Sequence, residues 1–244
     1  MGWYNACTAV FDRRKAMVIG LIVAIADEID ELLGTFGTPL GTENFTGFKV
    51  MHYRIGSNDV YVAESGAGEV AAASTTQMLI TKFGAEMIMN FGVVGGLTDR
   101  MKVCSTVVVE SVVHYGFDSS AFIPGMVPAQ YYPYETVYIP TTEKYVKLAK
   151  EIAPELESVI CASGDRFIAA AEDKRDLHDR FNADICEMEA VGITLTCHRN
   201  GVPVLLIKAV SDSVSGGGEE FAAMVSAAAA TAVKVLVKVL ERVA

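Results

Sequence analysis

Short, mostly apolar runs alternate along this chain with longer segments of helical character. The runs MVIGLIVAI (17–25), AEMIMNFGVV (85–94) and VPVLLIKAV (202–210) lack the polar alternation of a strand with one face in water. Helical patterns at 27–36 and from residue 219 onward follow the first and the last of these runs, and helical patterns at 68–83 and 186–201 precede the second and the third. A strand that is apolar on both faces needs cover on both faces. The pattern therefore predicts an α/β fold whose sheet is mostly buried between helical layers.

Composition limits the class of protein. The 244 residues are 51% hydrophobic, which suits one large domain with a full core. The formal net charge is −10 and no run is rich in Lys or Arg, so no nucleic-acid surface is expected. We expect no membrane contact either, because the apolar runs are interrupted before the roughly 18 residues of a membrane span.

The first 16 residues lack the charged-then-apolar order of a signal peptide. We interpret residues 1–16 as a leader or disordered extension and residues 17–244 as the domain. The five cysteines are scattered without a CxxC motif, and the four histidines show no zinc spacing. These features predict free thiols in a reducing cytoplasm and no metal site.

Two glycine-rich turns follow predicted strands. SGAGEVAAA (65–73) fits a loose GxGxxA dinucleotide pattern, but the next strand ends in NFG (90–92), without the acidic residue that binds the ribose. A tight turn with close helix packing explains these glycines better. NFGVVGGL (90–97) could hold an anion or a sugar with its backbone amides, which is a weak signal alone.

Carboxylates lie where predicted strands end. Asp212 ends the run VPVLLIKAVSD, at the edge where open α/β sheets bind ligands, although an Asx-turn or helix cap explains it equally well. Glu187 and Glu189 lie in CEMEAVGI (186–193), where acidic residues could merely complement a helix dipole. Glu28 belongs to an acidic helix start after the first strand.

Six segments in order resemble the purine nucleoside phosphorylase/nucleosidase superfamily, and within it the nucleosidases of 5′-methylthioadenosine and S-adenosylhomocysteine. They are IGLIVAIADEIDEL, ESGAGEVAAA, NFGVVGGL, SGDRFI, CEMEAVGI and VPVLLIKAVSD, and the resemblance runs from Met17 to the C-terminus. It implies a single α/β domain with a mixed, barrel-like central sheet flanked by helices. It also implies a homodimer, a small purine nucleoside as substrate, and neither a metal nor an organic cofactor.

The resemblance implies roles for three carboxylates. Asp212 would protonate N7 of the departing purine, for which burial should raise its pKa above the ordinary value of about 3.9. Glu28 would activate the attacking water on the other face of the sugar, as in inverting glycosidases. Glu189 would accept hydrogen bonds from both ribose hydroxyls.

Further residues would complete the site by the same resemblance. Met188 would pack under the sugar, Phe167 would stack on the purine, and the backbone of Ile168 would bind its edge. Ser211 would support Asp212, and Phe122 would reach into the partner subunit's site from the Pro/Tyr-rich loop 121–140. The substrate-binding set also includes Glu187 and Lys208.

Three positions depart from the family pattern. Val94 replaces a Ser or Thr that helps to hold water or phosphate, Lys208 stands where many members have Arg, and Arg166 replaces a small residue beside the purine. Two alternatives therefore stay open: a phosphate-dependent phosphorylase, and a nucleoside-binding or storage protein without catalysis. Lost donors disfavour the phosphorylase, because a phosphate dianion needs several. The three carboxylates disfavour the binding protein.

Overall fold

The computed structural model describes residues 16–243. Residues 1–15, nearly all of the predicted leader, lie outside the described residues, as does Ala244. The division of the chain into a leader and a domain therefore stays a prediction. The strands and helices below follow the predicted ones closely, with three differences.

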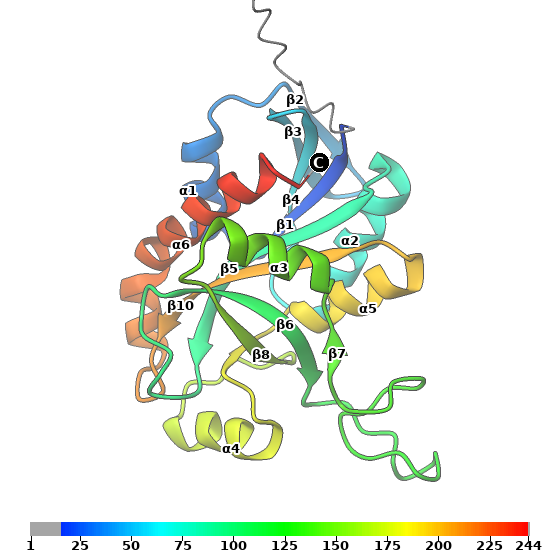
Figure 1. Cartoon of the computed structure of the whole chain (residues 1–244), viewed down its shortest axis with the longest axis vertical. Helices are drawn as coiled ribbons and strands as arrows, with labels where there is room; N and C mark the ends of the chain where they lie inside the picture. Colours follow the sequence, from blue (N-terminus) through cyan, green and yellow to red (C-terminus); the bar gives the residue numbers. More distant parts are fainter. Residues whose placement is uncertain (1–15, 244) are drawn as a thin grey trace, which may run out of the picture.

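A ring of five strands forms the centre of the fold. Neighbouring strands pair in the order β10, β6, β8, β9 and β5, and β5 pairs in turn with β10, which closes the ring. The β10–β5, β6–β8 and β8–β9 pairs are parallel, whereas β10–β6 and β5–β9 are antiparallel. The five strands are β5 (Met87–Gly96), β6 (Thr106–His114), β8 (Glu157–Ser163), β9 (Ile185–Glu187) and β10 (Val204–Asp212). The predicted mixed, barrel-like sheet is thus confirmed (Figure 1).

An open wing extends the sheet from β5. It runs through β1 (Val18–Val23), β4 (Asn58–Glu64), β3 (Phe48–Ile55) and β2 (Gly41–Phe45). The predicted hairpin is β3–β4. β2 was not predicted, because its sequence GTENF is polar and it is an exposed edge strand whose main contact is with β3.

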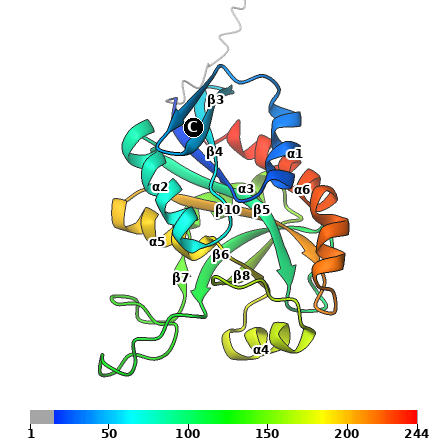
Figure 2. The ribbon, with the colours of Figure 1, turned by 180° about the vertical axis from the view of Figure 1, so that it is seen from behind.

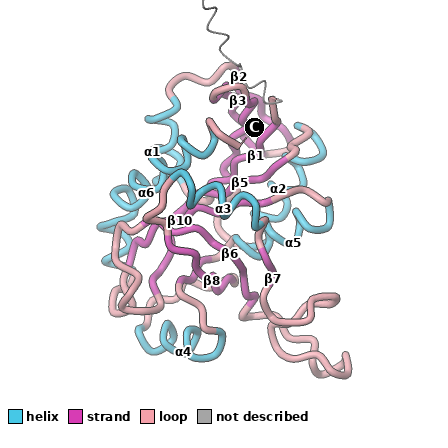
Figure 3. The backbone as a smooth tube through the Cα atoms, viewed as in Figure 1, coloured by secondary structure: helices cyan, strands magenta, loops and turns pink. Residues whose placement is uncertain are grey.

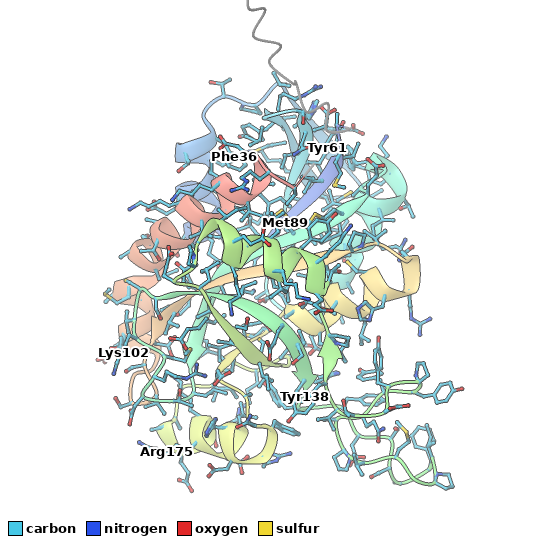
Figure 4. The ribbon with its side chains drawn as sticks, in the orientation of Figure 1. Phe36, Tyr61, Met89, Lys102, Tyr138 and Arg175 are labelled. Atoms are coloured by element: carbon cyan, nitrogen blue, oxygen red, sulfur yellow. The ribbon has the colours of Figure 1, made fainter. Side chains whose placement is uncertain are left out.

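Helices cover both faces of the sheet. α1 (Ala26–Phe36) and α6 (Gly218–Leu240) lie together on one side, and α2 (Glu69–Phe83) and α5 (Ala190–Asn200) lie on the other (Figures 1 and 2). α3 (Glu143–Ile152) packs against α6, β6 and β10. Met89 of β5 lies fully buried near the centre of the molecule (Figure 4).

α6 corrects the prediction about apolar runs. Residues 218–240 are long and apolar enough, by length and composition alone, to cross a membrane. In this structure α6 packs against α1, β5 and β10, and residues such as Val225, Ala232 and Leu236 enter the main core. The long apolar run therefore covers the sheet, and the small alanines 227–230 permit close approach.

The segment CEMEAVGI corrects a second boundary. The predicted helix was to begin at residue 186, but Cys186 and Glu187 belong to β9, and α5 begins at Ala190. Cys186 belongs to a strand because it pairs with Gly95 of β5 on one side and with Ala162 of β8 on the other. Only tertiary neighbours can make so short a segment a strand.

The Pro/Tyr-rich segment is the predicted loop. It is irregular until the two-residue strand β7 (Ile139–Pro140), which pairs with β6. Figures 1 and 3 show it leaving the body of the molecule as a long excursion. α4 (Ala171–Phe181) lies at the same end of the barrel.

Candidate active site

A cavity of about 170 Å³ opens where β1, β5 and β10 end. These three strands are parallel to one another, so their carboxyl ends meet at one edge, the usual place for a ligand in an α/β sheet. Its lining comprises Ala24, Ile25, Glu28, Ala67, Val93, Val94, Gly95, Phe167, Cys186, Glu187, Met188, Glu189, Ser211, Asp212 and Phe221. Seven of the ten predicted site residues are therefore brought together here.

Glu28 occupies the first turn of α1 and is buried. Its Oε1 accepts a hydrogen bond from the Val93 N–H (2.7 Å), and its Oε2 accepts one each from Ala24 and Ile25 (3.2 Å). Burial raises the pKa of Glu28, against the opposing effect of the Val93 hydrogen bond and of the Lys208 charge. A carboxylate offers about four acceptor positions, so one remains for a further donor such as water.

The predicted glycine-rich turn 90–97 is wrong, because residues 90–96 continue β5 by pairing with β10 and β9. Gly92, within this strand, makes room for Glu28, since a Cβ there would lie 2.8 Å from Glu28 Oε1. The next residue, Val93, donates its backbone N–H to the same oxygen.

Asp212 ends β10 and is 1% exposed. The Ser211 hydroxyl lies within hydrogen-bond distance of Asp212 Oδ1 (2.8 Å) and of the Val94 carbonyl (3.2 Å). The role implied for Ser211, supporting the loop beside Asp212, stays a prediction. Lys174 Nζ lies 2.5 Å from Oδ2. The buried Asp212 carboxyl group therefore has an ammonium group as a direct partner.

Glu189 precedes the first turn of α5. Its Oε1 accepts a hydrogen bond from Gly68 N (2.8 Å), whose positive φ of 102° suits glycine alone. Within residues 16–243, its Oε2 accepts no hydrogen bond, which leaves that oxygen for a ligand. Burial and the nearby Glu187 charge raise the pKa of Glu189 to about 7.

Glu187 lines the cavity but is already occupied by protein donors. Its Oε2 accepts hydrogen bonds from the backbone of Glu189 and Ala190 (3.0 and 2.9 Å) and pairs with Lys208 Nζ (3.2 Å). Burial lowers the pKa of Lys208, but the charges of Glu187 and Glu189 outweigh it and raise the value overall. Lys208 does not line the main cavity, so contact of either side chain with a substrate stays a prediction.

Aromatic rings form one wall. Phe167 meets Phe221 of α6 edge to face, with ring centroids 5.3 Å apart, and both rings line the cavity. A small adjoining cavity of about 30 Å³ is lined by Phe167, Ile168, Met188 and Asp212 among others. This side is flat and apolar enough for a heterocyclic base, with Asp212 beside it.

Phe122 lies elsewhere. It is 75% exposed on the long loop and is not among the residues lining the cavity. Its position suits a contact with another molecule, and a role in a neighbouring subunit stays a prediction.

Two of the three positions that depart from the family pattern line a cavity. Val94 is buried in the wall of the main cavity, and its backbone carbonyl accepts a hydrogen bond from the Ser211 hydroxyl. Arg166 lines the small cavity but pairs with Asp173.

The sequence analysis assigned no site role to Lys174, Phe221 or Cys186, and predicted for Cys186 only a free thiol, as the structure has it. A signal for Lys174 exists, because it shares the buried face of α4 with Leu177 and Phe181 at helical spacing. A lysine at an apolar position needs an anionic partner. Within residues 16–243, no cluster of three or more His, Cys, Asp or Glu side chains could hold a metal ion.

Comparisons with known proteins agree with this geometry. Residues 18–244 match the model of the family described as the phosphorylase superfamily. The chain is 32% identical over 200 residues to the aminodeoxyfutalosine nucleosidase of Helicobacter pylori strain 26695, covering 80% of this chain and 85% of that protein. It is 30% identical over 205 residues to the 5′-methylthioadenosine/S-adenosylhomocysteine nucleosidase of Shewanella halifaxensis, covering 82% and 87%.

Solved structures share the whole fold. The futalosine hydrolase of Helicobacter pylori superposes with a TM-score of 0.86 at 29% identity, covering 93% of this chain and 99% of that chain. The 5′-methylthioadenosine/S-adenosylhomocysteine nucleosidase of the same organism, solved in complex with a substituted pyrrolidin-3-ol, superposes with a TM-score of 0.87 at 28% identity, covering 94% of this chain and 100% of that chain.

Proposed function

The chain belongs to the phosphorylase superfamily, and from that membership we propose that it is a nucleosidase that hydrolyses adenine nucleosides of the 5′-methylthioadenosine and S-adenosylhomocysteine type. The resemblance read from the sequence is confirmed, since curated relatives over four fifths of the chain are named nucleosidases, which are hydrolases of N-glycosidic bonds. One observation carries the proposal. Three buried carboxylates from different elements, Glu28, Glu189 and Asp212, line one cavity with an aromatic wall.

Asp212 is the proposed general acid. It gives its proton to N7 of the purine while the bond between C1′ and N9 breaks, so that adenine leaves as a neutral base. An adenine anion would be a poor leaving group, and a positioned acid contributes about 10²- to 10⁴-fold in rate. Its place beside Phe167 and Ile168 supports this role.

Glu28 is the proposed general base. Water donates one hydrogen bond to Glu28 and attacks C1′ as the sugar becomes oxocarbenium-like. Glu28 takes the water proton, and exchange with solvent returns Glu28 and Asp212 to their starting states. The single acceptor position that its backbone partners leave supports this role.

Glu189 is the proposed ribose ligand. Its unoccupied Oε2 would accept from one hydroxyl and its Oε1 from the other, with Met188 against the sugar. A carboxylate is stronger than a neutral group in this role, because hydrogen bonds to charged groups are stronger.

Hydrolysis is favoured over phosphorolysis by the charges present. No Lys or Arg belongs to the described residues that line the main cavity. The two buried ammonium groups nearby, on Lys174 and Lys208, already pair with Asp212 and Glu187. Val94 supplies no hydroxyl. A phosphate dianion would find few donors.

Aminodeoxyfutalosine-type nucleosides are a second substrate candidate, since that name belongs to relatives at 32% identity. We further propose a cytoplasmic homodimer in which Phe122 covers the 5′-group in the neighbouring site. The exposed rings and aliphatic chains of Phe122, Ile123, Val127 and Tyr132 on one loop support such a contact.

Adenine release, followed by chromatography with and without phosphate, tests the proposal. The substrates are 5′-methylthioadenosine, S-adenosylhomocysteine and aminodeoxyfutalosine. Free sugar and adenine at equal rates in both buffers support a nucleosidase. Release of a sugar 1-phosphate only with phosphate would show a phosphorylase, and binding without release would show a binding protein.

A further inference from the structure

Lys174 is a fully buried lysine that the proposed reaction does not use. It lies on α4 and is 0% exposed. Its Nζ donates to Asp212 Oδ2 (2.5 Å), to the Ser213 carbonyl (2.6 Å) and to the Gly216 carbonyl (3.0 Å). An ammonium group has three donors, and all three are used. A buried charge with this complete a set of partners is a built feature of the fold.

All three partners belong to the end of β10 and to the loop that follows it, residues 213–217, here called the β10–α6 loop. The same loop is held from α6, because Glu220 Oε2 accepts from the backbone N–H (2.6 Å) and the hydroxyl (2.9 Å) of Ser213. α6 carries Phe221, which lines the cavity. Lys174 therefore connects Asp212, the loop and one wall of the cavity.

We propose that Lys174 is a positioning residue for Asp212 and that it stabilises the carboxylate that Asp212 becomes when it gives its proton to the purine. Lys174 does not line the cavity, so it acts only through Asp212. The proton balance is simple. Asp212 loses its proton to N7, Lys174 keeps its own protons, and the new anion lies beside the existing ammonium group. The stabilisation grows as the proton leaves, so it lowers the barrier. This proposal rests on the proposed nucleosidase function.

Several other ionisable groups lie near the pair formed by Lys174 and Asp212. Burial raises the pKa of Cys186 to about 12, so this thiol beside the pair is neutral near pH 7. The hydrogen bonds from Ser213 lower the pKa of Glu220, which stays anionic. Among the described residues, the ionisable groups around the main and the adjoining cavity also include Glu187, Lys208, Glu28, Glu189 and Arg166, which pairs with Asp173.

Two variants at this position separate charge from packing. Lys174→Met keeps the length of the side chain and removes its charge, and Lys174→Arg keeps the charge. Arg175→Met is the matched control, because Arg175 lies on the same helix, is exposed and does not line the active-site cavity (Figure 4). Adenine release from the best substrate is measured from pH 5 to pH 10 for all four proteins.

We expect Lys174→Met to lower kcat about 10- to 100-fold with little change in KM, since the lost effect belongs to the transition state. Lys174→Arg, which keeps the charge, should restore kcat to within a few-fold of the wild type, and Arg175→Met should leave kcat and KM unchanged. A Lys174→Met variant with wild-type kcat, or one whose loss lies in KM, would overturn the proposal. A Lys174→Arg variant as slow as Lys174→Met would overturn it as well.

Hydrogen exchange supplies a readout that needs no activity. The Gly216 amide donates to Ser213 O and Oγ, so loss of the lysine should speed exchange in the β10–α6 loop relative to Arg175→Met. If the wild type releases no adenine, the function fails and this comparison still decides the positioning role. Equal exchange in both variants would then overturn it.

Discussion

At the scale of single residues, the site depends on carboxylates whose surroundings differ. Glu28 is held by three backbone N–H groups, Glu189 by one, and Asp212 by a hydroxyl and an ammonium group. The three carboxylates proposed as base, ribose ligand and acid therefore differ in their hydrogen-bond partners.

Replacing Glu28 by Gln tests the proposed base. The amide keeps the shape of the side chain but cannot take a proton from water. We expect kcat to fall about 10²- to 10⁴-fold, measured by adenine release. Thermal unfolding checks that the fold survives the loss of a carboxylate partner for Val93. A variant that is folded and fully active would remove Glu28 from the reaction.

The raised pKa of Glu189 predicts that substrate affinity depends on pH. Its pKa of about 7 means that the carboxylate loses its charge as pH falls through neutrality. A protonated Glu189 accepts hydrogen bonds poorly, so KM should rise below about pH 7 and level off above it. Steady-state kinetics from pH 5.5 to 8.5 measure this. Glu189→Gln should show a higher KM that varies little over the same range; an equal rise in both would assign the effect to another group.

At the scale of elements, the site depends on where strands and helices begin and end. Glu28 reaches the end of β5 because α1 starts directly after β1, and Gly92 leaves the space that its carboxylate fills. The short strand β9 places Glu187 to stabilise the start of α5 and to pair with Lys208. The boundaries of these strands and helices therefore position the carboxylates of the site.

Gly92→Ala tests this dependence without replacing a proposed catalytic residue. The new Cβ would lie 2.8 Å from Glu28 Oε1, so the carboxylate must move and kcat should fall at least tenfold. Gly34→Ala is the control, because Gly34 lies within α1 and its Cβ would meet nothing within 4 Å. That variant should keep full activity and gain about 0.5–1 kcal/mol in unfolding free energy. Equal activity of the two variants would show that the space at Gly92 is not needed to position Glu28.

At the scale of the whole molecule, one cavity is lined by residues from regions far apart in the chain, from Ala24 to Phe221. The closed five-strand ring brings the ends of β5, β9 and β10 together, and the wing adds β1. None of the residues 121–140 of the long loop belongs to the described residues that line this cavity.

Phe122→Ser tests the proposed assembly. If the ring covers the 5′-group in a neighbouring site, its loss should raise KM about tenfold or more for a substrate with a large 5′-group. Sedimentation measures whether the variant still dimerises. Adenosine, with its small 5′-hydroxyl, is the internal control. A KM unchanged for both substrates would place Phe122 outside the site.

The sequence by itself determined much of this protein. Apolar runs without polar alternation predicted a sheet covered on both faces, because helix and strand periods are local properties. The local pattern left the roles of Asp212 and Glu189 open, and only the resemblance of six segments to a known family assigned them. The tertiary structure decided the rest. β9 exists only through its pairing with β5 and β8, and Lys174 meets Asp212 across 38 positions of sequence. The closure of the ring likewise joins strands far apart in the chain, and no local pattern encodes such contacts.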